Sequence, residues 1–257
     1  MTGNHTWPAQ QGLVLSDLHL FSGRSEGAAC MRSIHSLLNS VQILVLNGDI
    51  FDFRWSTLND PYASIAAAVE WLSTLAKKRS HCHIHYLLGN HDCCRKFTGE
   101  LNQLAATQPR FHWYEYSLRL GSALFLHGDC AHRPMNQQQL NEFRELWRGD
   151  WQRGGLLTAG YRWVDRLGIT RRVHDWHFPR QKTVERIAFY LDTAAAGWRQ
   201  TIRDCYFGHT HLPFVNHEFD GVRFHNTGSA IRGMEFNPLR FETRLEPDPP
   251  PAQAARR

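Results

Sequence analysis

The sequence predicts an α/β fold in one large domain, and three observations lead to this prediction. Short apolar runs rich in Val, Ile, Leu, Phe and Tyr alternate with segments of helical periodicity. The apolar runs end at polar segments, usually with a glycine, which is typical of buried strands that deliver loops to one edge of a sheet. The chain has 257 residues, which is enough for one such domain with a sizeable insertion.

Five apolar runs are expected to form buried strands. These runs are Gly12–Ser16, Val41–Leu46, His83–Leu88, Ser122–Leu126 and Cys205–Phe207. Between the first three runs, Ala28–Ser40 and Tyr62–Arg79 place apolar residues three and four positions apart, which predicts two helices. The order strand, helix, strand, helix, strand indicates an α/β arrangement.

Two further patterns predict β-structure. Phe214–Phe219 and Val222–His225 are separated by an Asp-Gly step, which is typical of a two-residue hairpin turn. His81, His83 and His85 alternate along the chain, so we expect them to share one face at the partly exposed start of a strand.

The stretch Ala131–Gln200 differs from the rest, and we interpret it as a helical cap inserted into a single domain of residues 1–245. It holds 12 Lys and Arg against 7 Asp and Glu, whereas the remainder of the chain holds 17 of each. Its arginines could meet a diphosphate or anionic headgroups, and its tryptophans could line an acyl cleft or an interface. These residues are Arg144, Arg148, Arg153, Arg162, Arg166, Arg171, Arg172, Trp147, Trp151 and Trp163. A helix pair with a solvated basic face is the equal alternative.

The two ends of the chain show no targeting or membrane signal. Residues 1–11 lack a basic region followed by an apolar run, and no stretch approaches the roughly 20 apolar residues that cross a bilayer. We therefore expect a cytoplasmic protein, with peripheral contact at the inner face of the membrane through the basic cap as an open alternative. Residues 246–257 are rich in Pro and Ala, and we expect a disordered tail there.

Candidate metal ligands follow the first and the last of the five runs. In Asp17-x-His19 and His209-x-His211, residues two positions apart point to the same side of an extended chain. Carboxylate and imidazole ligands together suit Mn, Fe or Zn better than Ca or Mg alone. Either pair alone is weak evidence, because such spacings occur often by chance.

The complete set of strand-end residues makes a stronger case for a metal centre. A carboxylate such as Asp49 can bridge two cations, and two cations about 3.5–4 Å apart can clamp a phosphate and activate a water. We therefore predict two divalent ions, with Mn as the first choice and Fe or Zn open. The candidate ligands are Asp17, His19, Asp49, Asn90, His127, His209 and His211.

Five sequence blocks resemble the calcineurin-like metallophosphoesterase superfamily. The blocks are Asp17-Leu-His19, Gly48-Asp49-Ile-Phe-Asp52, Gly89-Asn90-His91-Asp92, His127-Gly128 and Gly208-His209-Thr-His211. The resemblance spans residues 12–230 with the insertion left aside, and it implies a four-layer sandwich of two mixed β-sheets flanked by helices. It also implies that Asp49 is shared by both ions. One ion would be held by Asp17, His19, Asp49 and His211, and the other by Asp49, Asn90, His127 and His209.

The same resemblance implies an acid unit beside the metals. His91 would protonate the leaving oxygen or stabilise charge on it, and Asp52 would orient His91 and fix its tautomer. Capping of a helix is the alternative role for Asp52. For Asp92 we expect capping of the next turn, and for Asn226-Thr-Gly228-Ser229 we expect a structural turn.

The resemblance extends to one bacterial branch, the UDP-2,3-diacylglucosamine diphosphatases, in length, in the position of the cap and in Asp17-Leu-His19-Leu20. That branch has Arg where this chain has His91, and Gly-Asn-His-Asp is common to general phosphodiesterases. We therefore predict a metal-dependent phosphoric ester or diphosphate hydrolase that acts on a phosphorylated small molecule or a lipid nucleotide. A nucleotide or nucleic-acid phosphodiesterase is the alternative, followed by a non-catalytic scaffold on the same fold.

Overall fold

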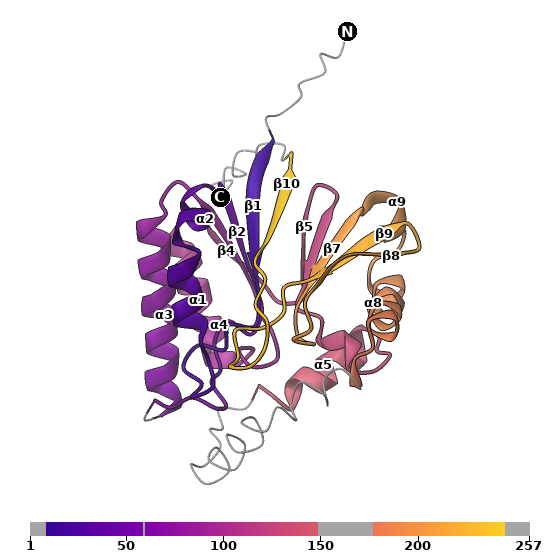
Figure 1. Cartoon of the computed structure of the whole chain (residues 1–257). Helices are drawn as coiled ribbons and strands as arrows, with labels where there is room; N and C mark the ends of the chain where they lie inside the picture. The colour runs from indigo at the N-terminus through magenta and orange to yellow at the C-terminus, as the bar shows by residue number, and fades with distance from the viewer. Residues whose placement is uncertain (1–8, 59, 149–176, 245–257) are drawn as a thin grey trace, which may run out of the picture.

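The computed structural model describes residues 9–58, 60–148 and 177–244, and within them the chain forms the predicted sandwich. Two five-stranded sheets face each other, and helices cover the outer face of each sheet (Figure 1). Each sheet contains both parallel and antiparallel strand pairs. The prediction of an α/β fold with two mixed sheets flanked by helices is therefore confirmed.

The first sheet has the strand order β10-β1-β2-β3-β4, in which β1 to β4 are parallel and β10 is antiparallel to β1. Its strands are β1 (Gln10–Leu15), β2 (Ile43–Asn47), β3 (His83–Leu87), β4 (Phe111–Tyr114) and β10 (Leu239–Thr243). Every residue of β2 is buried, because helices cover one face of the sheet and the second sheet covers the other. Strand β10 alternates between buried and exposed residues, as expected for an edge strand.

Four helices cover the outer face of the first sheet (Figure 1). They are α1 (Gly27–Ser33), α2 (His35–Asn39), α3 (Pro61–Lys78) and α4 (Arg95–Thr107). The predicted helix Ala28–Ser40 is divided into α1 and α2 at Ile34, whose backbone is not helical. The start of α3 has Asp60 as its N-cap, which accepts a hydrogen bond from the Ala63 N–H at 2.7 Å, and proline in its first turn.

The second sheet has the strand order β5-β6-β7-β9-β8. Its strands are β5 (Ser117–Leu120), β6 (Ala123–Leu126), β7 (Asp204–Phe207), β8 (Phe214–Phe219) and β9 (Val222–Asn226). The predicted hairpin is confirmed, since β8 and β9 pair antiparallel across the Asp-Gly step. Asp220 and Gly221 have φ values of 49° and 78°, the left-handed conformation that a type I′ hairpin turn requires at both positions.

The described part of the insertion is mostly helical. It begins at the last residue of the short helix η1 (Asp129–Ala131) and contains α5 (Gln137–Glu145), α8 (Arg180–Ala194) and α9 (Trp198–Thr201). Helix α8 packs on the outer face of the second sheet through Val184, Ile187 and Leu191, among others. Trp151, Trp163 and five of the seven arginines lie outside the described residues, as does the predicted tail. Within residues 9–58, 60–148 and 177–244, no helix combines the length and hydropathy needed to span a bilayer.

The histidine pattern near β3 differs from the expectation in one respect. Strand β3 begins at His83, but His85 is only 6% exposed and its ring stacks on His112 of β4 at a centroid distance of 5.3 Å. These rings lie on the face of the first sheet that turns toward the second sheet, because Leu87, two residues further along, joins the core between the sheets. Burial, followed by the charges of His112 and His83, lowers the pKa of His85 to about 3.

Candidate metal centre

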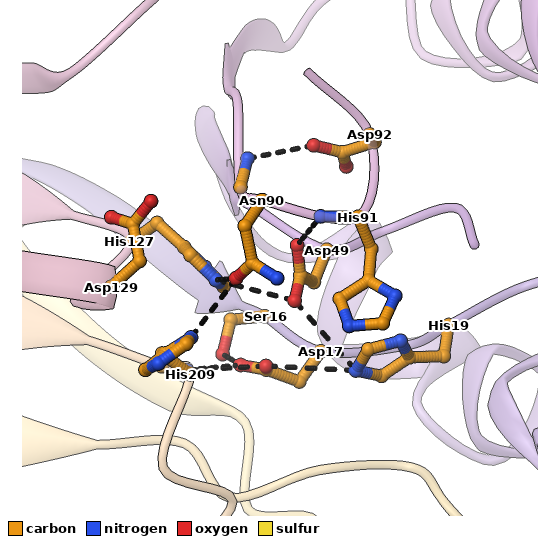
Figure 2. Close-up of polar contacts among 12 residues, drawn as sticks. Ser16, Asp17, His19, Asp49, Asn90, His91, Asp92, His127, Asp129 and His209 are labelled. Carbon is orange, nitrogen blue, oxygen red and sulfur yellow. Dashed lines mark hydrogen bonds and ion pairs between the residues drawn. The ribbon is translucent and has the colours of Figure 1, made fainter. Parts of the chain in front are cut away.

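All seven candidate ligands lie together at the carboxyl ends of strands from both sheets, and Figure 2 labels all of them except His211. Strands β1 and β2 lead directly to Asp17 and Asp49, and β3 is followed by the loop that carries Asn90. From the second sheet, β6 leads to His127 and β7 to His209. Each sequence block follows the carboxyl end of a strand, and these strand ends meet where the two sheets face each other.

The first group of ligand atoms comes from Asp17, His19 and His211, whose donor atoms lie within 4.8 Å of one another. Asp17 Oδ1 lies 3.2 Å from His211 Nε2 and 3.8 Å from His19 Nε2. The two imidazole nitrogens are 3.2 Å apart. One carboxylate oxygen and two imidazole nitrogens that converge in this way suit a divalent transition metal.

The second group comes from Asp49, His127 and His209, which also lie within 4.8 Å. Asp49 Oδ2 lies 3.3 Å from His127 Nε2. The side-chain oxygen of Asn90 joins this group, at 3.3 Å from His127 Nε2 and 3.0 Å from His209 Nδ1. The Asn90 oxygen therefore has the position of a neutral fourth donor.

Asp49 lies between the two groups, as Figure 2 shows. Its Oδ2 atom is 3.9 Å from His19 Nε2 in the first group and 3.3 Å from His127 Nε2 in the second. The other oxygen, Oδ1, accepts a hydrogen bond from the backbone N–H of His91 at 2.8 Å. The residues thus fit a pair of ions that share one carboxylate, and the nitrogen and oxygen donors leave Mn, Fe and Zn all compatible.

The electrostatics of the buried groups also fit a cation site. Burial alone would raise the pKa of Asp17, but hydrogen bonds with His19 and His211 hold it well below its usual range. Burial would lower the pKa of His19, yet the carboxylates of Asp17, Asp52 and Asp49 together raise it to about 10. The carboxylates thus attract positive charge strongly, and a metal ion would supply that charge in place of the imidazole protons.

The backbone at the ligands is strained. Asp17, His19, Asp49, His209 and His211 have φ values of 52°, 47°, 52°, 63° and 59°, in the left-handed region that residues with a Cβ rarely adopt. Such strain costs on the order of 1–3 kcal/mol per residue and persists where the surrounding structure enforces it, most often at functional sites. Five strained residues within one constellation are strong evidence for a function there.

Two glycines let the ligand loops approach the carboxylates closely. A Cβ at Gly89 would lie 2.1 Å from Asp49 Oδ1, and a Cβ at Gly208 would lie 2.1 Å from Asp17 Oδ2. Both distances are far below contact distance. The glycines of the sequence blocks are therefore needed for the carboxylates to reach their positions.

His91 and Asp52 form the predicted unit beside the ligands. His91 Nδ1 lies 3.1 Å from Asp52 Oδ1, and the His91 side chain is 14% exposed toward the pocket. Asp52 is fully buried, lies 3.5 Å from His19 Nδ1 and also accepts a hydrogen bond from the Trp55 N–H at 3.0 Å. Asp52 is therefore positioned to orient His91, and it also stabilises its own turn. It does not cap a helix, since the next helix, α3, begins at Pro61 with Asp60 as its N-cap.

Asp92 and the turn from Asn226 support the ligand loops. Asp92 accepts hydrogen bonds from the Gly89 N–H, the Ile50 N–H and the Tyr86 hydroxyl, so it fixes the Asn90 loop to the Asp49 loop. The expectation that Asp92 caps the next turn is wrong, because helix α4 has Cys94 as its N-cap residue. The predicted structural turn contributes through Ser229, whose hydroxyl donates to the Asp17 carbonyl at 3.0 Å.

Sequence reasoning missed a buried ion pair behind the site. Arg144 of α5 is 1% exposed and donates to Asp129 from Nε at 2.7 Å and from Nη2 at 3.0 Å. It also donates to the carbonyl oxygens of Leu88 and Glu115. The expectation that Arg144 meets an anionic substrate is therefore wrong. Arg148 is likewise held in ion pairs, with Glu115, which precedes β5, and with Glu145 of α5. The sequence signal that could have indicated this ion pair was Asp129, the acidic residue that ends the block His127-Gly128-Asp129.

A cavity of about 450 Å³ opens over the ligands and His91. Beyond the ligands, its lining includes Arg24 and Trp55, and from the insertion Trp147 with four further residues. Those four are His132, Phe143, His177 and Phe178. None of these lining residues except Trp147 was singled out from the sequence, because no pattern of spacing marks them.

The fold and the site together define a metal-dependent phosphoesterase, since a sandwich of mixed sheets carries two donor groups that share a carboxylate at its strand ends. Comparison with protein-family models supports this class, with residues 13–213 matching the calcineurin-like phosphoesterase model. The chain belongs to the calcineurin-like phosphoesterase family, and it is a hydrolase of phosphoric esters. No curated protein sequence matches it significantly.

Comparison with solved structures found similar chains, among them the following three. A phosphopantetheinyl hydrolase from Mycobacterium tuberculosis is 17% identical, with a TM-score of 0.44 over 88% of this chain and 91% of that chain. Yfce, a phosphoesterase from E. coli, is 15% identical, with a TM-score of 0.39 over 87% and 83%. A dimetal phosphatase from Danio rerio is 12% identical, with a TM-score of 0.45 over 92% and 99%.

Proposed function

We propose that this chain hydrolyses a phosphodiester or diphosphate bond with a dinuclear metal centre, and that Mn²⁺ is the preferred metal. The observation that carries the proposal is the position of Asp49, whose Oδ2 atom lies 3.3 Å from His127 Nε2 and 3.9 Å from His19 Nε2. Two ions held on either side of this carboxylate would supply Lewis-acid activation of the phosphoryl oxygen and of the attacking water.

Different residues of the chain bind the metal ions, donate the proton and orient the proton donor. Asp17, Asp49 and the four ligand histidines would hold the two metal ions, and thus their positive charge, where the phosphate binds. His91 is placed to donate a proton to the leaving oxygen, because its ring reaches the pocket while Asp52 holds Nδ1 at 3.1 Å. Asp52 stays ionised, because burial is outweighed by the charges and hydrogen bonds of His91 and His19, which hold its pKa below the usual range.

The reaction is tested with purified protein and bis(p-nitrophenyl) phosphate. Metal-free protein prepared with a chelator should be inactive, and activity should return on addition of Mn²⁺, with Fe²⁺ and Zn²⁺ as comparison metals. Metal analysis should give up to two ions per chain. Asp49→Ala should abolish turnover even at saturating Mn²⁺, because it removes a donor from both groups.

Asp60→Ala is the matched control, since it removes a carboxylate that only caps α3. It should keep the wild-type turnover per folded molecule. Unchanged activity in Asp49→Ala, or full activity without metal, would contradict the proposed centre.

The native substrate is proposed to be a phosphorylated small molecule or a lipid nucleotide, as in the branch that the sequence resembles. A screen with Mn²⁺ should compare p-nitrophenyl diesters, cyclic nucleotides and UDP-linked diacylglucosamine. Release of UMP from UDP-linked diacylglucosamine with a higher kcat/KM than that for hydrolysis of the other substrates would support the UDP-2,3-diacylglucosamine diphosphatase branch. Efficient cleavage of another diester with no release of UMP would contradict that branch while leaving the reaction class intact.

A further inference from the structure

The cavity over the candidate metal centre has one polar side and one aromatic side. The polar side consists of the ligands and His91. The aromatic side is a continuous row of rings, which we call the ring collar. The ring collar consists of Trp147, Phe143, His132, His177 and Phe178.

The ring collar runs from one end of the catalytic constellation to the other. Centroids of successive rings lie between 4.6 and 6.3 Å apart, the range in which aromatic rings attract one another. At one end the Trp147 ring lies 4.8 Å from His91, and at the other the Phe178 ring lies 5.7 Å from His209. The ring collar therefore borders the candidate metal centre, and its Trp147 end lies beside His91, the proposed acid.

Contacts with Arg54 and His91 hold the Trp147 ring in its orientation. The guanidinium of Arg54 lies 4.4 Å from the centroid of the Trp147 ring, and Arg54 donates a hydrogen bond to the Leu146 carbonyl at 3.1 Å. The ring of His91 packs against Trp147 at an angle of 44°. A pre-oriented aromatic side chain binds a planar partner with little loss of conformational entropy.

The described lining of the cavity is richer in aromatic rings than in cationic side chains. Among the described lining residues, Arg24 is the only arginine or lysine. Arg144 and Arg148 of the insertion are committed to Asp129, Glu115 and Glu145. Binding of a nucleic-acid backbone relies on many phosphate contacts from cations, whereas aromatic faces bind single planar rings.

We propose that the ring collar is a subsite for a planar aromatic group on the leaving side of the substrate. The enzyme would thus select small phosphoesters that carry an aryl ring or a nucleobase. The inference rests on the proposed function, because His91 defines the leaving side as the acid that protonates the leaving oxygen. A cavity of about 450 Å³ falls within the roughly 300–1,000 Å³ typical of small-molecule sites.

Binding of unreactive ligands tests the subsite independently of turnover. Isothermal titration calorimetry on Mn²⁺-loaded protein would compare phenylphosphonate with cyclohexylphosphonate, which has the same headgroup and a similar size but no planar ring. Wild-type protein should bind phenylphosphonate more tightly. Trp147→Leu should reduce that preference by about 2- to 10-fold, which corresponds to the stacking energy of an aromatic pair. Trp147→Phe should retain most of it.

Two further variants keep the test decisive. Trp113→Leu removes a tryptophan from β4 that lies outside the cavity and should leave the preference unchanged. Phe143→Leu removes a second ring of the collar and should reduce the preference if Trp147→Leu does not fold. Equal binding of the two phosphonates to wild-type protein would overturn the proposal, as would a preference that survives both Trp147→Leu and Phe143→Leu.

Uridine 5′-monophosphate and adenosine 5′-monophosphate distinguish the two sources of a planar ring. Nucleotides that bind more tightly than phenylphosphonate, and lose affinity in Trp147→Leu, identify a nucleobase as the occupant. Weaker binding of both nucleotides, with the phenyl preference intact, identifies a simple aryl group. Absence of hydrolysis with these binding results intact would refute the proposed reaction and leave the subsite standing, so the two failures are separable.

Discussion

Arg144 Nε lies 2.7 Å from Asp129 Oδ2, and Nη2 of the same guanidinium lies 3.0 Å from Oδ1, so two buried charges form a bidentate pair between the insertion and a ligand loop. Asp129 follows the ligand His127 by two residues, and Arg144 also binds the carbonyl of Leu88, just before the Asn90 loop. The pair therefore connects helix α5 to the loops of the second ligand group.

Removal of one partner of this pair should strongly destabilise the protein. Arg144→Met leaves Asp129 buried without a cation and two carbonyls without a donor, and we expect a loss of about 3–5 kcal/mol in the free energy of unfolding. Urea unfolding of metal-free protein measures it. Arg240→Met, at an exposed residue of β10, should change the free energy by less than about 0.5 kcal/mol. Equal effects of the two changes would contradict the role of the pair.

His91→Ala should lower kcat by roughly 10²–10⁴-fold on substrates whose leaving group needs a proton, as expected for loss of a general acid. The loss should be much smaller with p-nitrophenyl esters, because p-nitrophenolate leaves without protonation. Steady-state kinetics on a series of leaving groups measures this difference, with the exposed His81→Ala as control. A loss that is the same for every leaving group would show that His91 has another role.

Gly208→Ala should disturb the first ligand group. The added Cβ would lie 2.1 Å from Asp17 Oδ2 and 2.3 Å from Ser16 Oγ, so the Asp17 carboxylate must move. We expect weaker metal binding and a stability loss of about 1–3 kcal/mol, as for other overpacked sites. Gly99→Ala in α4 is the matched control, because its Cβ meets nothing within 4 Å and should stabilise the helix by about 0.4–1 kcal/mol. Metal titration and thermal unfolding report both effects.

The buried His85 should make the protein sensitive to acid. Burial, together with His112 and His83, lowers its folded-state pKa from 6.5 to about 3. The unfolded chain therefore binds a proton that the folded chain excludes. The contribution of neutral His85 to the free energy of unfolding is fully present above pH 6.5. It is lost as the pH falls toward 3, by up to about 1.4 kcal/mol per pH unit.

His85→Phe should flatten this dependence between pH 6.5 and pH 4.5, because phenylalanine keeps the stacked ring but cannot bind a proton. His81→Phe, at an exposed position, should keep the wild-type slope. Urea midpoints measured across that range provide the comparison. A slope that is identical in His85→Phe and wild type would show that His85 is not the responsible group.

The ligand set was predictable because strand chemistry is local. A buried parallel strand is an unbroken apolar run, and its polar loop begins at the next residue, so Asp17 and His209 could each be placed at the carboxyl end of a strand. The two strands belong to different sheets, β1 to the first and β7 to the second. The hairpin at Asp220 was predictable for the same reason, since the turn type is encoded in two residues.

The remaining elements depend on contacts between distant segments. Strands β4, β5 and β10 lie at sheet edges, where part of each strand is exposed, so none of them forms the unbroken apolar run that marks a buried strand. Arg144 was misinterpreted because net charge does not reveal which arginine of a basic segment is buried. His132 and His177, which lie 5.1 Å apart in the ring collar, are separated by 45 positions in sequence and carry no shared motif.

Each ligand group draws on both halves of the sandwich. Asp17 and His19 come from the first sheet and meet His211 of the second, while Asp49 of the first sheet meets His127 of the second. A bound ion would therefore join two layers that are also held by apolar packing and by hydrogen bonds from the Asn47 amide to the carbonyls of Leu126 and Tyr206. Binding of the ions should stabilise the contact between the two sheets at the edge where the chemistry takes place, in addition to the hydrogen bond from the His209 N–H to Asp17 Oδ2 at 3.0 Å.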